Sequence, residues 1–113
     1  MDNTDELIKL DVLFNKLKII LLQENEDNFI RGINSILNMI QFSLEYNENA
    51  KATIKSVGNT YFFMNSGNGS FSDFFIWRED FNERVEANKI LTNLRNDITS
   101  LIASVDNHLL NSR

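Results

Sequence analysis

Apolar side chains return at alternating steps of three and four along most of this 113-residue chain. Residues at that spacing share one side of an α-helix, so the pattern predicts amphipathic helices that each bury one face. The chain contains no proline, a residue that removes a backbone donor and interrupts helices. The apolar stripes predict helices over about 5–23, 28–46, 50–65 and 81–109.

Short polar breaks separate the stripes, and they offer side chains that could cap the helix that follows. Thr4 is predicted to cap the first helix, Asn25 or Asp27 the second, and Asp80 the last. Short connections favour antiparallel neighbours in a bundle. The expected fold class is therefore all-α, a four-helix bundle-like single domain over residues 1–113.

Three features of the expected helices need a decision. Gly32 either allows a neighbouring helix to approach closely or is simply tolerated, at roughly 1 kcal/mol against alanine. Thr60 and the aromatic run 61–63 are also typical of a strand, but helix is favoured because the apolar period is nearer to that of a helix. The last stripe implies a helix of about 30 residues, roughly 45 Å long. Its far end is therefore expected to project or to pack on another subunit.

Aromatic residues are concentrated between Tyr61 and Phe81. This stretch holds six of the nine phenylalanines and the only tryptophan, around a glycine-rich turn over 66–73. So small a domain needs most of these rings in its core, and Phe71, Phe74 and Phe81 are favoured there. Adjacent side chains cannot all point inward, so one or two of a second group are expected at the surface as partner contacts: Phe62, Phe63, Phe75 and Trp77.

The glycine-rich turn is the best candidate for a ligand site. Gly67 and Gly69 allow positive φ, and the backbone N–H groups of such a turn can receive an anion. The turn lacks the lysine of a phosphate loop and the third glycine of a dinucleotide-binding fingerprint. We favour a structural interpretation, in which Asp73 caps local amides. The residues predicted to contact a partner or ligand are Gly67, Gly69, Ser70, Phe71, Asp73, Phe75 and Trp77.

Reactive side chains are scarce, which argues against an enzyme. The chain has no cysteine, so thiolate nucleophiles and thiolate metal sites are excluded. His108 is the only histidine, and no serine lies in a nucleophile-elbow sequence. The neighbouring carboxylates are interleaved with arginines, as on a solvated surface: Asp73, Glu79, Asp80, Glu83 and Glu86. We predict no catalytic residue, no metal site and no cofactor.

The formal net charge is −5, with acidic and basic residues mixed along the chain. Without a basic stripe that displaces counterions from phosphates, nucleic-acid binding is not expected. The first residues are acidic where a secretory signal is basic, and the apolar run 19–22 is far too short to span a bilayer. We therefore expect a cytoplasmic protein with no membrane contact, whose acidity keeps it soluble or steers a basic partner.

The stretch 62–74, with the later Asn88 and Leu91-x-x-Leu94-Arg95, resembles a group of small bacterial helical proteins. These are uncharacterised or presumed to be immunity proteins beside polymorphic toxins. Their pattern is similar to Gly-x-Gly-Ser-(aromatic or Leu)-x-Asp-Leu, followed by a helix with Asn and Leu-Arg. The matching residues are Gly67, Gly69, Ser70, Phe71, Asp73, Asn88 and Arg95, while Asn68 and Phe74 depart from it. The resemblance covers about the C-terminal half and implies an all-helical fold and toxin neutralisation, without catalytic residues.

Three functions stay open on the sequence alone. The first is a non-enzymatic protein-binding module, most concretely a bacterial immunity protein that occludes a cognate toxin domain. The second is a small helical homo-oligomer such as a homodimer, with a scaffold or regulatory role, driven by the long last helix. The third is an anion or small ligand bound at the turn Gly67–Asp73.

Overall fold

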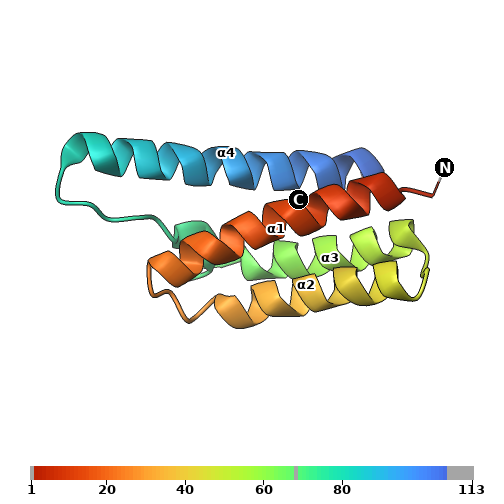
Figure 1. Cartoon of the computed structure of the whole chain (residues 1–113). Helices are drawn as coiled ribbons and strands as arrows, with labels where there is room; N and C mark the ends of the chain where they lie inside the picture. Colours follow the sequence, from red (N-terminus) through yellow and green to blue (C-terminus); the bar gives the residue numbers. More distant parts are fainter. Residues whose placement is uncertain (1, 68, 107–113) are drawn as a thin grey trace.

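Helices dominate the described residues, which in this computed structural model are 2–67 and 69–106. In order they form α1 (Thr4–Gln23), α2 (Ile30–Glu45), α3 (Ala50–Met64), the short 3₁₀ turn η1 (Phe71–Asp73) and α4 (Phe81–Val105). No strand occurs within those two ranges. The predicted all-α, four-helix bundle-like fold is confirmed, and successive helices run antiparallel (Figure 1).

Helix α1 packs against α2, α3 and α4, so its apolar stripe lies at the centre of the core. The residues of that stripe are each at most 1% exposed: Leu7, Leu10, Phe14, Leu17 and Leu21. Ile33, Ile36 and Ile40 of α2 are buried against it. The spacing of apolar residues therefore predicted the inward faces of both helices correctly.

Helix α3 confirms the choice of helix over strand for the residues that precede the glycine-rich turn. Ile54, Val57 and Tyr61 are buried at helical spacing. Gly32 of α2 lies directly beneath the end of α3, because a Cβ there would be only 2.6 Å from Met64 Sδ. The close approach that Gly32 offered is thus used by the fold.

The predicted cap of α4 is confirmed, since Asp80 Oδ2 accepts a hydrogen bond from the Glu83 N–H at 2.9 Å. A side-chain cap that the sequence reading did not name begins α3, where Asn49 Oδ1 accepts from the Ala52 N–H at 3.0 Å. Both arrangements satisfy an N–H group that has no partner inside its helix.

The caps predicted for the first two helices were wrong. Thr4 is the first residue of α1 rather than its cap, and its N–H donates to Asp2 Oδ1 at 3.1 Å. Neither Asn25 nor Asp27 caps α2, which follows Phe29 without a side-chain cap. The ring of Phe29 instead lies 5.1 Å from that of Phe71. Apolar contact, which sequence spacing cannot show, therefore positions the start of α2.

Helix α4 departs from its predicted stripe at its beginning. Leu91, Leu94 and Ile98 are buried as expected, but Phe81 and Val85 are 65% and 50% exposed. Figure 1 shows the reason: the first turns of α4 extend beyond the ends of the other helices, where there is no core to face. Within the described part of α4, the end that projects is thus the N-terminal one. The predicted extension of this helix to 109 and the residue His108 lie outside the described residues.

Candidate functional site

An extended segment over 74–80 connects η1 to α4 and carries two exposed aromatic rings. Side chains of an extended backbone alternate between its two sides. Ile76 is accordingly buried, at 4% exposure, while Phe75 and Trp77 on either side of it are 60% and 62% exposed. The two rings are therefore presented on the same side of the segment.

Asn88 of α4 holds this segment in place through a pair of hydrogen bonds to one residue. Its Oδ1 accepts from the Ile76 N–H at 2.8 Å, and its Nδ2 donates to the Ile76 carbonyl at 2.7 Å. The same Nδ2 also donates to the carbonyl of Arg84 at 2.8 Å. The amide thus satisfies both backbone groups of a buried residue, as a neighbouring strand would.

Arg95, which follows Asn88 further along α4, holds the 3₁₀ turn η1 in place. Its Nη2 donates to the carbonyls of Phe71 and Phe74, at 2.5 and 3.1 Å. Its guanidinium carbon lies 4.6 Å from the centroid of the Phe71 ring, a cation–π contact. Burial lowers the pKa of Arg95. Burial also raises the pKa of the neighbouring Tyr61.

The glycine-rich turn adopts the backbone that its sequence predicts. Gly67 and Gly69 have φ of 85° and 74°, and Asp73 Oδ2 accepts from the Gly69 N–H at 2.7 Å. The hydroxyls of Ser70 and Ser72 lie 2.8 Å apart in a hydrogen bond. Asp73 therefore caps a local amide, as the structural interpretation predicted. Since its carboxylate occupies that donor and repels anions, we do not propose an anion site at this turn.

The exposed rings continue onto the projecting end of α4. The guanidinium carbon of Arg84 lies 4.3 Å from the Trp77 ring and 5.4 Å from the Phe81 ring, so one cation joins the two aromatic groups. We call the set Phe75, Trp77, Phe81, Val85 and Arg84 the aromatic patch.

The predicted contact residues fall into two groups. Phe75 and Trp77 lie together in the aromatic patch, whereas the turn residues Gly67, Gly69, Ser70 and Asp73 lie in the connection before it. Phe71 is fully buried and cannot touch a partner, which confirms its core assignment and corrects its place among the contacts.

The core assignments of the other aromatic residues are partly corrected. Phe74 is only partly buried, and the core prediction for Phe81 was wrong. Of the group from which one or two exposed rings were expected, Phe63, Phe75 and Trp77 are all exposed. The sequence reading therefore missed Phe81, Val85 and Arg84, although their spacing of three and four residues places them on one side of a helix.

A salt bridge anchors the segment to the end of α1. Arg78 Nη1 and Nη2 donate to Glu24 Oε1 and Oε2 at 2.8 and 2.6 Å. These hydrogen bonds from Arg78 lower the pKa of Glu24 from its ordinary value of 4.5. The pair is partly open to water, so its strength is reduced by screening.

The Glu24–Arg78 pair predicts a pH-dependent contribution to stability. A carboxylate whose pKa is lower in the folded than in the unfolded protein stabilises the fold at pH values above its unfolded-state pKa. That stabilisation is lost as the pH falls through the folded-state pKa. Thermal unfolding followed by circular dichroism should give Glu24→Gln a lower melting temperature than the wild type at pH 7. That gap should shrink as the pH falls below about 4.5. Glu45→Gln, on the exposed surface of α2, is the control, and an undiminished gap at pH 3 would contradict the assignment.

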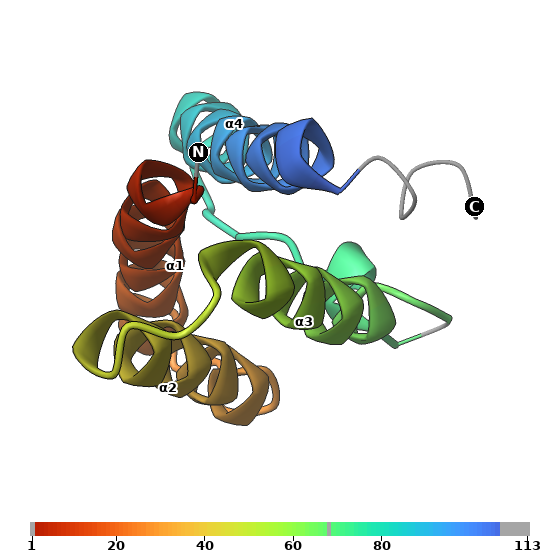
Figure 2. The same cartoon turned by 90° about the vertical axis from the view of Figure 1, so that its right-hand side faces the viewer.

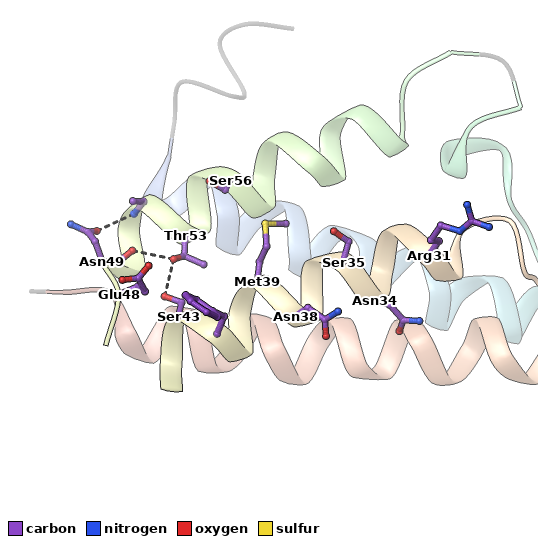
Figure 3. Close-up of a pocket in the computed structure, with 12 residues that line it drawn as sticks. Arg31, Asn34, Ser35, Asn38, Met39, Ser43, Glu48, Asn49, Thr53 and Ser56 are labelled. Carbon is purple, nitrogen blue, oxygen red and sulfur yellow. Dashed lines mark hydrogen bonds between the residues drawn. The ribbon is translucent and has the colours of Figure 1, made fainter. Parts of the chain in front are cut away.

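Hollows also occur elsewhere on the described surface, and two of them lie beside α3. An open groove of about 920 Å³ lies between α2 and α3, where Ser35 and Met39 point toward α3 (Figure 3). At one end of it, the Thr53 and Ser43 hydroxyls form a 2.7 Å hydrogen bond. A smaller cavity of about 210 Å³ lies between α3, η1 and α4, with Arg95 in its wall. Neither lining pairs a nucleophile with a base among the described residues.

The acidic residues near the aromatic patch do not form a metal site. Within residues 2–67 and 69–106, no group of three or more His, Asp or Glu side chains is placed to hold a metal ion. The carboxylates discussed from the sequence are all exposed: Asp73, Glu79, Asp80, Glu83 and Glu86. Four of them, Glu79, Asp80, Glu83 and Glu86, accordingly lie on the solvated surface beside the aromatic patch, whereas Asp73 belongs to the glycine-rich turn.

Comparison with known proteins supplies no further identification. No family model, no curated protein and no solved structure matches the chain. None of the helices in the described part of the chain has the length and hydrophobicity of a membrane span. The functional assignment therefore depends on the geometry of the site, and the resemblance to immunity proteins stays a prediction.

Proposed function

We propose that the protein is a non-enzymatic protein-binding module that binds its partner through the aromatic patch. The observation that supports this most directly is that Phe75, Trp77 and Phe81 are each at least 60% exposed. The first two lie on a segment held by hydrogen bonds, and the third begins α4. Rings that are mostly exposed to water contribute little to the core of the monomer. Large aromatic side chains and arginine are the residues that dominate binding energy at protein interfaces.

The way the segment is held supports binding rather than simple exposure. Asn88 and Arg95 of α4 form hydrogen bonds to the backbone of residues 71–76. Arg78, within the same stretch of chain, forms hydrogen bonds to Glu24 at the end of α1. A surface ordered before binding loses little conformational freedom when the partner arrives, which raises affinity. The aromatic patch is thus preorganised by contacts that come from α4 and from the end of α1.

The charge around the aromatic patch indicates the chemistry of the partner. Glu79, Asp80, Glu83 and Glu86 are exposed beside it, and the whole chain carries a net charge of −5. We therefore propose a partner with an apolar pocket surrounded by lysine or arginine. Such complementary charge mainly accelerates association and selects the partner.

The finer form of the proposal is a bacterial immunity protein that occludes a toxin domain in the cytoplasm. It draws on the resemblance of the glycine-rich turn and of α4 to the presumed immunity proteins. It also draws on the net negative charge, which would suit a basic toxin. Its test is growth: co-expression of this chain should rescue cells that express the toxin encoded beside its gene. Rescue should be lost when the co-expressed protein carries Trp77→Ala. If the toxin still kills cells that contain soluble wild-type protein, the immunity proposal is refuted.

Trp77→Ala should weaken binding to the partner by roughly 30-fold, about 2 kcal/mol, because it removes a central aromatic anchor. The partner is recovered by pull-down from the native host, purified, and titrated against the wild type and the variant by calorimetry. Folding is checked by the melting temperature, which should hardly change because Trp77 is 62% exposed.

Phe63→Ala is the matched control for this measurement. Phe63 is 81% exposed but belongs to α3, outside the aromatic patch. Its replacement should leave the dissociation constant within about twofold. Equal losses from the two variants, or a pull-down that recovers only chaperones, would count against the proposal.

A further inference from the structure

Helix α1 is apolar on two opposite sides. Its inner stripe forms part of the core. A second set of large apolar residues faces outward: Ile8 is 47% exposed, Val12 49%, Ile19 54% and Leu22 54%. Helices of single domains usually have one apolar face, and a helix that is apolar all round is buried. The outer face of α1 therefore calls for a covering surface that the described residues do not supply.

The arrangement of the helices leaves this face accessible. α1 lies between α2 and α4, with α3 behind it, so its outer side is directed away from the rest of the bundle (Figure 2). The aromatic patch involves other elements, the segment 74–80 and the start of α4. The two surfaces are thus separate, and this inference goes beyond the proposed partner site.

The outer residues have the spacing of a coiled-coil seam. Positions 8, 12, 15, 19 and 22 follow one another at steps of four and three, which corresponds to two heptads. In that register Val12 and Ile19 take the a positions, and Ile8, Asn15 and Leu22 take the d positions. In parallel coiled coils, β-branched residues at a and leucine at d favour two strands. Asn15 occupies the middle of the seam, and its Nδ2 donates to the Asp11 carbonyl of its own helix.

One pair of charged residues beside the seam is complementary between two copies. Asp11 and Lys16 lie five residues apart on its two edges, the separation that brings g and e positions together between parallel helices. In a symmetric pair, Asp11 of each copy would lie against Lys16 of the other, so both contacts are attractive. Of the g–e pairs in this register, Asp11–Lys16 is the one that joins two charged residues, and its attraction favours a second copy of the same chain.

We propose that two copies of this protein associate in parallel through the outer face of α1, with Val12, Ile19 and Leu22 in the seam. Arg78 binds Glu24 just beyond the end of α1, so the segment 74–80 is anchored near that end. A parallel pair would therefore present both aromatic patches toward the same end of the dimer. Partners with two binding sites would gain avidity from that arrangement.

Sedimentation equilibrium of the full chain tests the association. The wild type should be dimeric at concentrations of tens of micromolar, and Ile19→Glu should weaken the dimer by at least about 30-fold, because it buries a charge in the seam. Ile90→Glu is the matched control: Ile90 is 53% exposed, as Ile19 is at 54%, but it lies on α4. A monomeric wild type, or equal dissociation by both variants, would overturn the proposal.

Disulfide trapping tests the orientation, and the absence of cysteine from the chain makes it clean. A disulfide forms only where two Cα atoms approach within about 7 Å. Leu22→Cys should therefore cross-link with itself in a parallel pair, while Val85→Cys in the aromatic patch should not. Failure of Leu22→Cys to cross-link, or efficient cross-linking through Val85→Cys alone, would contradict pairing through α1.

Discussion

Replacing Phe71 with alanine is expected to lower the free energy of unfolding by about 3–5 kcal/mol, the largest effect predicted for this protein. Phe71 is fully buried, and its ring lies 5.1 Å from that of Phe29 and 5.9 Å from that of Phe74. It also carries the cation–π contact to Arg95. The substitution would leave a cavity beside Phe29, Tyr61 and Arg95. Urea denaturation followed by circular dichroism measures the change.

Phe75→Ala is the control, because Phe75 lies in the same connection but is 60% exposed. It should change the free energy of unfolding by less than about 0.5 kcal/mol. Phe71→Leu keeps much of the buried volume and should cost clearly less than Phe71→Ala. Equal effects from Phe71→Ala and Phe75→Ala would show that Phe71 is not the anchor of the connection.

Asn88→Ala is expected to lower the free energy of unfolding by about 2–4 kcal/mol, since it leaves two backbone groups of Ile76 without a partner. Ile76 is only 4% exposed, so water cannot readily replace the lost amide. Partner binding should weaken as well, although Asn88 is not itself part of the aromatic patch. Once the segment 74–80 is released, Phe75 and Trp77 lose their fixed orientation.

Asn93→Ala serves as the control on the same helix, because the Asn93 side chain is exposed and forms no hydrogen bond to another described residue. Asn88→Asp separates the two bonds. A carboxylate can still accept from the Ile76 N–H but cannot donate to the Ile76 carbonyl when ionised. If Asn88→Asp were as stable as the wild type at pH 7, the donated hydrogen bond would have no role in holding the segment.

Much of the aromatic patch could be anticipated, but not its extent. Phe75 and Trp77 were predicted contacts because neighbouring bulky residues cannot all enter one core. Phe81 was assigned to the core because it continues the apolar stripe of its helix. Only the structure shows that α4 begins beyond the other helices, where the same stripe meets solvent.

The residues that hold the aromatic patch were visible in the sequence without their role. Asn88 and Arg95 entered as matches to a motif, and their hydrogen bonds span 12 and 24 residues along the chain. Contacts at that separation depend on how α4 lies against the segment 71–76, and spacing within one helix carries no information about it. The outer face of α1 was overlooked for a different reason, since its inner stripe already explained the helix.

The amino-acid sequence by itself determined the helices, their inward faces and the cap at Asp80, because these depend on neighbours within about four residues along the chain. The tertiary structure alone decided the start of α2, the exposure of Phe81 and the pairing of Asn88 with Ile76. Each of these depends on which distant residue occupies a given space. Local periodicity fixes which face of a helix is apolar, whereas only packing decides whether another element covers it.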